Sequence, residues 1–308
     1  MSGPFCIVVN PAAGQGRSQR ALAAVLATLD TAGVAYHVSE SSSLDNAREI
    51  AGRAAQLGEV VVAVGGDGTA GALAGVVAGA GGRYGIIPAG RGNDIARVLG
   101  IPATPASAAL VLLHGQSRTM DLIGVSVPGR PETAVVGSVY AGVPSIAGEI
   151  ANRERWLPGP LHYPVAALRA LARWTPATFR AEIRCGAAGA AVHEFPGYAI
   201  VVANVAYFGA GMQVAPPAVI DDGILDVVIM RDGPKLAFVR ALAKVSSGTH
   251  LTLPQISIER GTEVILSIDR DMTAAADGET LSCAAPLRAA TPLRIRALPG
   301  ALTILTPR

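Results

Sequence analysis

The chain has 308 residues, which is long enough for one large domain or for two smaller ones with a sizeable core. Its formal net charge is only +2 and no cluster of lysine and arginine marks a groove-binding element, so nucleic acid is not the expected partner. The mean hydropathy of +0.41 is high. Even so, glycine, proline or a charged residue interrupts every apolar stretch before the roughly 18 to 20 residues that span a bilayer, so we expect a chain that is not transmembrane.

No basic segment precedes the short apolar run at the N-terminus, so no secretion signal is expected and the predicted location is the cytoplasm. The three cysteines, Cys6, Cys185 and Cys283, are odd in number and widely separated. This spacing argues against a disulfide framework and against a zinc site, and it indicates buried thiols. The five histidines show no ligand spacing and are assigned no role.

The first part of the chain alternates strand patterns with helix patterns. Strands are predicted at residues 5–9, 35–38, 60–64 and 84–87. Helices are predicted at residues 19–32, 45–57, 70–78 and 93–99. Such alternation is typical of a parallel sheet with helices on both faces, in which ligands bind beyond the carboxyl ends of the strands. The loops at residues 10–16, 39–43, 65–69 and 88–94 should therefore converge on one crevice.

The most informative stretch runs from Val60 to Thr69. An apolar run without a polar side chain is broken there by Gly65, Gly66 and Gly68 around Asp67. Glycines let a phosphate approach the backbone closely, and the N–H groups at the start of the following helix attract anions. A carboxylate beside a phosphate is unfavourable unless a cation lies between them. The turn therefore indicates a Mg-nucleotide site, although a plain connecting loop of small residues remains the alternative.

From Asp121 onwards, runs of valine, isoleucine and threonine predominate and few of them alternate with helices. Strands are predicted at residues 122–127, 134–140, 179–183, 199–205, 225–230, 256–258, 264–268 and 293–295. Helices are predicted at residues 145–154, 164–174 and 235–246. This pattern favours a second, largely antiparallel β domain. We expect one domain at residues 1–122 and another at residues 123–308, and the return of the last strand to the first domain is left open.

Six motifs then occur in order. They are Asn10-Pro11 with Gly14, Gly65-Gly66-Asp67-Gly68-Thr69, Pro88-Ala89-Gly90 with Gly92-Asn93-Asp94, Asn204 with Gly209-Ala210-Gly211, Asp221-Asp222-Gly223-Ile224-Leu225-Asp226, and Asp277-Gly278-Glu279. Together they resemble the diacylglycerol kinase and sphingosine kinase superfamily, nearly end to end. The chain is most similar to the soluble bacterial branch, because it has only the two domains of the catalytic core.

The resemblance implies an α/β nucleotide-binding domain similar to those of NAD kinases and phosphofructokinases, followed by a larger β-sandwich-type substrate domain. The active site would lie in the interdomain cleft. The implied reaction is ATP-dependent phosphorylation of a lipid hydroxyl, from diacylglycerol to phosphatidic acid, with Mg²⁺ as cofactor. The implied partner is a lipid at a membrane surface. The protein would reach it as a peripheral protein at the inner face of the membrane, and a homodimer is left open.

The resemblance also implies roles for individual residues. ATP would contact Asn10, Gly14, Ser41, Gly65, Gly66, Asp67, Gly68, Thr69, Arg91, Asn93 and Asp94. The catalytic Mg²⁺ would have a carboxylate and water network from Asp67, Asp94 and Asp121. The base that accepts the hydroxyl proton would be Asp277 or Glu279. A separate structural Mg²⁺ would be held by Asp222 and the main-chain carbonyls near Val219 and Ile224.

Glycine turns, carboxylate-held magnesium and one general base are sufficient for phosphoryl transfer, because the protein mainly positions the reactants. Taken singly, Asp222-Gly223 and Asp277-Gly278 would be ordinary turns, and Asp121 a surface acid. The chain also departs from the family pattern. Arg91 stands where a threonine is usual, Ala72 replaces a glutamate, and Pro144 replaces an acid. These changes leave altered substrate preference or reduced activity open.

Other functions remain open at this stage. The acceptor could be another lipid, or a sphingoid or isoprenoid-like alcohol. A NAD kinase would share the turn from Gly65 to Thr69, but the Asp277-Gly278-Glu279 ending fits it poorly. A non-catalytic lipid-binding regulator would keep an apolar cleft without phosphoryl transfer.

Overall fold

The computed structural model describes residues 3–11, 16–153, 159–186, 189–209, 211–281, 287 and 291–308, without the side chains of residues 152, 153 and 159–163. The chain divides into two compact units. Unit 1 comprises Met1–Leu122, Ala134–Val136 and Leu298–Arg308, and unit 2 comprises Ile123–Thr133 and Gly137–Ala297. Among the described helices, none combines the length and the apolar character needed to cross a membrane.

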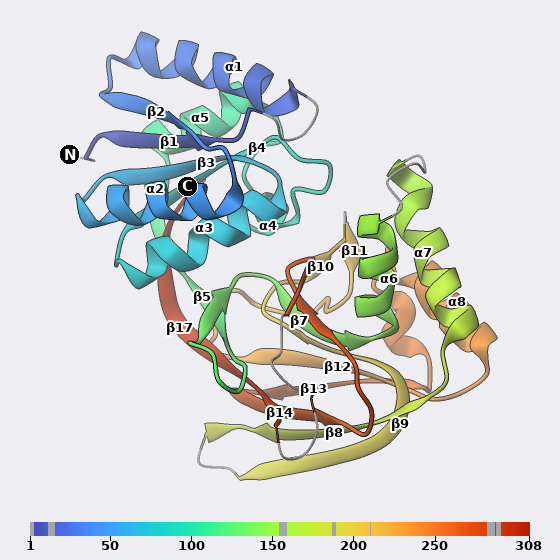
Figure 1. The fold of residues 1–308 in the computed structure, drawn as a ribbon. Coiled ribbons are helices and arrows are strands. Elements are labelled where there is room, and N and C mark those ends of the chain that lie inside the picture. Colours follow the sequence, from blue (N-terminus) through green and yellow to red (C-terminus); the bar gives the residue numbers. More distant parts are fainter. Residues whose placement is uncertain are drawn as a thin grey trace. The chain divides into compact units, whose positions relative to one another are not determined.

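Unit 1 is built on a parallel sheet in the order β2-β1-β3-β4 (Figure 1). Its strands are β1 (Phe5–Val9), β2 (Tyr36–Glu40), β3 (Val60–Gly65) and β4 (Arg83–Pro88). Every residue of β1 and β3 is buried, as expected of central strands that helices cover on both faces.

Helices flank this sheet. They are α1 (Arg17–Ala32), α2 (Leu44–Gln56), α3 (Asp67–Gly79), α4 (Asp94–Val98) and α5 (Pro105–His114). Helix α1 packs with α5 and helix α2 packs with α3. Figure 1 shows the two pairs on opposite faces of the sheet. The predicted alternation is therefore confirmed, and with it the α/β class of this part of the chain.

Two local predictions for unit 1 need correction. Helix α3 begins at Asp67 rather than at residue 70, so Asp67, Gly68 and Thr69 form its first turn instead of a loop. An acid in the first turn is favourable because it faces the positive end of the helix dipole. Helix α5 was not predicted, although Pro105 at its start is a typical helix-initiating residue.

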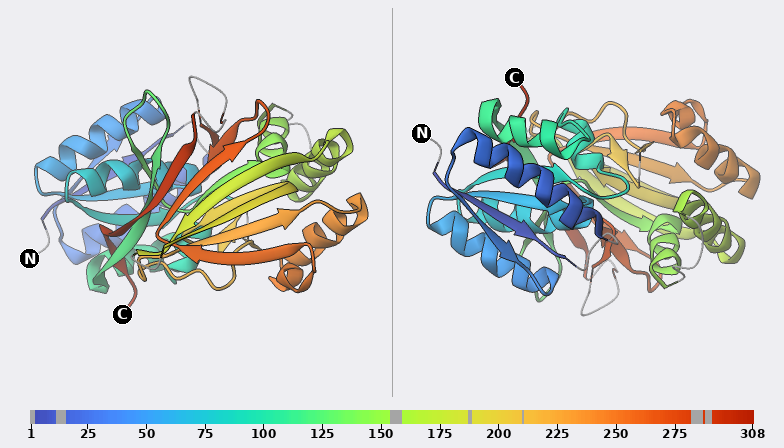
Figure 2. Two further views of the ribbon diagram at one scale, coloured as in Figure 1. Left: turned by 90° about the horizontal axis from the view of Figure 1, so that it is seen from below. Right: turned by 90° about the horizontal axis from the view of Figure 1, so that it is seen from above.

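Unit 2 is a largely antiparallel β structure. Its strands are β5 (Gln116–Ser126), β6 (Thr133–Val135) and β17 (Leu293–Thr306), all three shared with unit 1, and β7 (Ser138–Gly142), β8 (Ala177–Arg184), β9 (Ala190–Ala203), β10 (Tyr207–Phe208), β11 (Met212–Gln213), β12 (Leu225–Arg231), β13 (Ile256–Gly261), β14 (Glu263–Ile268), β15 (Ala274–Ala276) and β16 (Glu279–Thr280). Its helices are α6 (Val143–Arg153), α7 (Gly159–Arg173), α8 (Lys235–Val245) and the short 3₁₀ helix η3 (Thr249–Thr252). Helices α7 and α8 lie at the same end of the strands (Figure 2).

Strand β9 organises this unit because its two halves have different neighbours. Residues 190–197 pair with β8, whereas residues 199–203 pair with β7 on one edge and with β12 on the other. The sequence predicted only its second half, since the first half is mostly exposed and lacks a long apolar run. Likewise, β17 was predicted to end at residue 295 but continues to Thr306.

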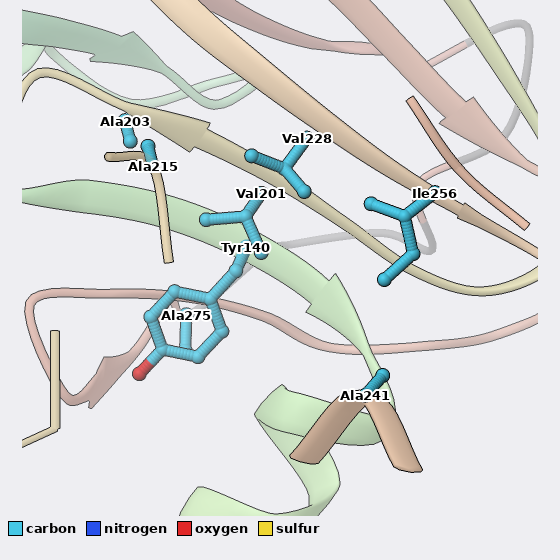
Figure 3. Packing of buried hydrophobic residues seen from close by; sticks show 8 residues of the cluster. All are labelled: Tyr140, Val201, Ala203, Ala215, Val228, Ala241, Ile256 and Ala275. Carbon is cyan, nitrogen blue, oxygen red and sulfur yellow. The ribbon is translucent and has the colours of Figure 1, made fainter. Parts of the chain in front are cut away.

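A row of apolar side chains crosses the unit 2 sheet. Strand register aligns Ala275, Tyr140, Val201, Val228 and Ile258 on β15, β7, β9, β12 and β13. Figure 3 shows the first four of these side chains beside Ala241 of helix α8, and they belong to one buried cluster. The face of the sheet that carries this row therefore packs against α8.

Candidate active site

The predicted ligand loops of unit 1 lie at one edge of its sheet. Register aligns Val9 of β1 with Glu40 of β2 and with Val64 of β3, while Gly65 aligns with Pro88 of β4. Because the strands are parallel, the residues that follow them lie at the same, carboxyl edge. The strand pairing therefore brings Asn10, Ser41, Gly66 and Ala89 to neighbouring positions.

Two glycine turns touch at this edge. A methyl group at Gly90 would lie 2.5 Å from Gly66 Cα, and one at Gly66 would lie 3.0 Å from Gly90 Cα. The Ala89 N–H donates to the Gly65 carbonyl over 2.8 Å, which extends the β3–β4 pairing into the turns. Glycine is needed at positions 66 and 90 because the two backbones meet without room for a side chain.

The amino end of α3 carries the features of an anion site. Its N-cap residue is Gly66, which has no side chain that could accept a hydrogen bond from the first-turn N–H groups. Gly68 is exposed, and a methyl group there would meet nothing within 4 Å. Gly65, in contrast, leaves space for Thr69, because a methyl group at position 65 would lie 2.9 Å from the Thr69 side chain. The helix therefore presents main-chain N–H groups without an N-cap side chain beside an open position.

Asp67 connects this helix to the next one. Its Oδ1 accepts a hydrogen bond from the Ile95 N–H over 3.0 Å, so the carboxylate caps the first turn of α4. Asn93 has a left-handed backbone with φ 54°, and its Oδ1 accepts from the Gly90 N–H over 2.8 Å. Asn93 therefore holds the β4–α4 turn in shape, while Arg91 on the same turn is exposed.

The carboxylates predicted around the catalytic metal have individual partners. Asp94 is buried, with the Arg97 Nε 3.7 Å from its Oδ1. Asp121 is also buried and accepts from the Gly300 N–H over 2.7 Å. In the described part of unit 1, Asp67, Asp94 and Asp121 do not form a group of three carboxylates within 4.8 Å of one another. The part of the chain that the structure describes therefore shows no direct three-acid cage of Asp67, Asp94 and Asp121.

The serine loop after β2 is held by its own hydrogen bonds. Ser41 is buried, and both its N–H and its hydroxyl donate to the Val9 carbonyl, over 2.8 and 3.3 Å. Ser43 caps α2 by accepting from the Asn46 N–H over 3.1 Å. Gly14 lies outside the described residues. Ser41 thus fixes the loop that follows β2 against the end of β1.

In unit 2, Asp277 and Glu279 flank a tight hairpin. Asp277 has φ 47° and Gly278 has φ 89°, as a two-residue turn between β15 and β16 requires. Asp277 Oδ1 accepts two main-chain hydrogen bonds, from the Gly137 and Ser138 N–H groups, each over 2.9 Å. Glu279, in contrast, is exposed. Two main-chain donors therefore hold the Asp277 carboxylate in one orientation.

The predicted structural-metal turn contacts an arginine on β13, and the sequence did not reveal this contact. Asp222 Oδ1 accepts from the Ile224 N–H over 3.0 Å, and its Oδ2 pairs with Arg260. Asp226 is fully buried and neither of its oxygens has a hydrogen bond to the described residues, but the Arg260 Nε lies 3.5 Å from Oδ1. Burial raises the pKa of the Asp226 carboxyl despite the opposing effect of Arg260. Only the β12–β13 register, which places Arg260 opposite Asp226, explains this contact.

Unit 2 also contains an apolar cavity of about 80 Å³ that is partly open to solvent. Its lining includes Val201, Phe208, Val228, Phe238 and Ala241. His250 is the one histidine among the described lining residues, and its Nε2 lies 3.0 Å from the Val214 carbonyl. Its Nδ1 is buried without a hydrogen-bond partner. Burial lowers the pKa of His250, so the ring is held neutral.

Comparison with known proteins identifies the family. Residues 4–125 match the diacylglycerol kinase catalytic domain, and residues 137–306 match the YegS C-terminal NAD kinase beta sandwich-like domain. A diacylglycerol kinase from Mycobacterium tuberculosis is 30% identical over 99% of this chain and 96% of its own length. The chain belongs to the diacylglycerol kinase and YegS family of lipid kinases.

Further relatives of this lipid kinase agree. A probable lipid kinase YegS-like from Stenotrophomonas maltophilia is 30% identical over 81% of the chain and 79% of its own length. A putative diacylglycerol kinase from Bacillus anthracis has the same fold, with a TM-score of 0.79 at 22% identity, covering 99% of this chain and 97% of that structure. The family model and the kinase-named relatives confirm the enzyme class that the resemblance implied. A kinase of this family takes its phosphoryl group from ATP.

Proposed function

We propose that this kinase transfers the γ-phosphate of ATP to the free hydroxyl of diacylglycerol and so forms phosphatidic acid. The observation that carries the choice of substrate is the apolar cavity of unit 2, because its aliphatic, methionine and aromatic lining suits acyl chains. The Mycobacterium tuberculosis relative, named a diacylglycerol kinase, supports the same substrate. An acceptor such as NAD, which is polar and charged, would gain little from such a cavity.

ATP would bind at the carboxyl edge of the unit 1 sheet. The uncapped N–H groups of the first turn of α3 would donate to phosphate oxygens, and the exposed Gly68 would leave space for their approach. Arg91, exposed on the adjoining turn, would add a guanidinium for the phosphates. Asn10 and Thr69 would complete the nucleotide contacts, while Ser41 and Asn93 would hold the loops in shape.

The carboxylates at this edge would suit a Mg²⁺ ion that keeps part of its water shell. Mg²⁺ retains several waters and is usually held by one or two carboxylates together with substrate phosphates. Asp67 and Asp94, without a three-acid cage among the described residues, match that requirement, whereas Asp121 bonds to Gly300, which lies three residues before Thr303, the partner of the first residue of β4. A bound Mg²⁺ would neutralise charge on the phosphate oxygens. Asp67 would serve both the ion and, through the Ile95 N–H, the position of α4.

Asp277 is the residue that we favour as general base. Two main-chain N–H groups fix one carboxylate oxygen, so the group keeps a single orientation for accepting the hydroxyl proton. Glu279, by contrast, is exposed. Orientation of the base matters because proton transfer requires hydrogen-bond distance to the reacting hydroxyl.

The structural Mg²⁺ at Asp222 also remains a proposal. The buried Asp226 carboxylate without hydrogen bonds supports a cation nearby, with main-chain carbonyls at Val219 and Ile224 as further ligands. Arg260 already supplies one positive charge. We expect added Mg²⁺ to raise the melting temperature of an Asp67→Asn background without nucleotide, and Asp222→Ala to abolish that rise. If added Mg²⁺ still raises the melting temperature of Asp222→Ala, the metal is not bound at Asp222. If Mg²⁺ does not raise the melting temperature of the Asp67→Asn background either, Arg260 is the sole counterion of this turn.

The reaction is tested by measuring ATP-dependent phosphorylation of diacylglycerol, sphingosine, an isoprenoid alcohol and NAD in detergent micelles. We expect diacylglycerol to be the preferred acceptor. Filling the cavity by Ala241→Phe should reduce transfer to the lipid while leaving nucleotide binding unchanged, because Ala241 is buried on the cavity side of α8. Ala243→Phe on the exposed side of the same helix is the matched control. Preference for another acceptor would refute the proposed substrate, and equal activity of both variants would refute the role of the cavity.

A further inference from the structure

The opposite edge of the unit 1 sheet carries three metal-binding side chains. Cys6 is the second residue of β1, His37 is the second residue of β2, and Glu59 directly precedes β3. Register pairs Cys6 with His37 on one side and with Val61 on the other. Glu59 lies two residues before Val61 and therefore shares its face of the sheet, because side chains alternate along a strand. Strand pairing alone thus places the three groups together.

The distances suit one ion. The Cys6 Sγ, a His37 ring nitrogen and a Glu59 carboxylate oxygen all lie within 4.8 Å of one another, and the His37 Nε2 is 3.8 Å from the Glu59 Oε2. Bond lengths of about 2.0 to 2.3 Å to a tetrahedral zinc ion place its ligand atoms about 3.3 to 3.8 Å apart. Side-chain adjustments of about an ångström or less would therefore complete the geometry.

The surroundings leave access from one side. The Cys6 residue is 1% exposed, whereas the His37 side chain is 49% exposed and the Glu59 side chain 16%. A cation can therefore enter beside His37, and solvent can supply a fourth ligand there. Without a metal, His37 and Glu59 form a contact at the surface, and the Cys6 thiol donates a long hydrogen bond to the Ser39 Oγ, 4.0 Å away. Such a surface pair contributes little to stability.

We propose that Cys6, His37 and Glu59 bind a zinc ion that joins the edge strand β2 to β1 and β3. A thiolate, an imidazole and a carboxylate form a donor set that suits zinc, whereas magnesium prefers oxygen ligands alone. The Cys6 thiol releases its proton to solvent when it binds the metal. The site is separate from the nucleotide edge, because Cys6 lies four residues, or about 13 Å along an extended strand, before Asn10.

The test uses full-length, tag-free protein with Cys185→Ser and Cys283→Ser, which leaves Cys6 as the sole cysteine of the chain. Cobalt(II) is titrated in place of zinc in the absence of nucleotide, because cobalt gives a charge-transfer band when a thiolate binds it. We expect one cobalt per chain with this band, and its loss when zinc is added. A single-cysteine protein that binds no cobalt, or binds it without the band, overturns the proposal.

Matched variants separate the site from other cobalt-binding groups. His37→Asn and Glu59→Gln should each weaken cobalt binding by about tenfold or more, since changes even in outer-shell partners of a metal have effects of that size. His193→Asn, a histidine on β9 in unit 2, is the control and should bind as the parent does. Zinc should also raise the melting temperature of the parent but not of His37→Asn, whose half-exposed side chain can be replaced without disturbing the core. Equal affinity in all variants overturns the assignment.

Discussion

Substitution of Asp277 by asparagine should separate its proposed role as a base from its structural role. Asparagine keeps an Oδ1 acceptor for the Gly137 and Ser138 N–H groups, and it tolerates the left-handed backbone at this position. Asp277→Asn should therefore retain the melting temperature while kcat falls by about 10² to 10⁴, because only the basic oxygen is lost. Glu279→Gln is the comparison and should have a smaller effect. If transfer slows in Glu279→Gln but not in Asp277→Asn, then Glu279 is the base.

His250 makes the stability of the kinase depend on pH. Its pKa in the folded state is lowered by burial, whereas the unfolded chain binds a proton with the ordinary pKa of about 6.5. Below about pH 6.5 the unfolded state therefore holds a proton that folded His250 lacks, so stability falls as the pH is lowered. His250→Gln, which keeps a donor for the Val214 carbonyl, should show a smaller loss of melting temperature between pH 7 and pH 5. An identical pH dependence in the variant would contradict this role.

At the scale of elements, the two glycine turns predict substitutions with opposite effects. Gly68→Ala adds a methyl group in open space within the first turn of α3, so it should raise stability by up to about 1 kcal/mol while weakening ATP binding. Gly90→Ala forces a methyl group to 2.5 Å from Gly66 Cα and should lower the melting temperature. Thermal unfolding with and without ATP distinguishes the two. A Gly68→Ala protein that binds ATP as tightly as the wild type would contradict the placement of the phosphates.

The sequence predicted the features of the site that depend on a single element, but not those that depend on contacts between elements. The apolar run of β3 and its glycines located the strand end correctly, because burial and turn chemistry are local properties. The partners of the acids could not be predicted, since tertiary register determines them. Asp67 bonds to a residue 28 positions away, Asp277 to one 140 positions away, and Asp121 to one 179 positions away. For the same reason, neither Arg260 beside Asp222 nor His37 beside Cys6 was recognised.

At the scale of the whole molecule, the last strand completes the sheet of the first unit. Residues 298–308 belong to unit 1, where Thr303 and Ile304 pair with Arg83 and Tyr84 of β4. Leu302 and Ile304 are fully buried. A chain that ends at residue 297 should therefore lose ATP binding and aggregate, because β4 keeps an open edge. A chain that ends at Thr306 is the control and should behave as the full-length protein. Soluble ATP binding by the shorter chain would show that β17 is dispensable.

This return of the chain determines the order in which the protein can fold on the ribosome. Residues 1–122 emerge first, but the strand that completes their sheet follows 176 residues after Leu122, at residue 298. At a synthesis rate of about 5 to 20 residues per second, that interval lasts about 9 to 35 s. During this time the outer edge of β4 has no neighbour, and an unpaired edge strand is a template for association with other chains. The nascent kinase should therefore depend on chaperones that bind it before translation ends, and on their release only after its final residues have been made.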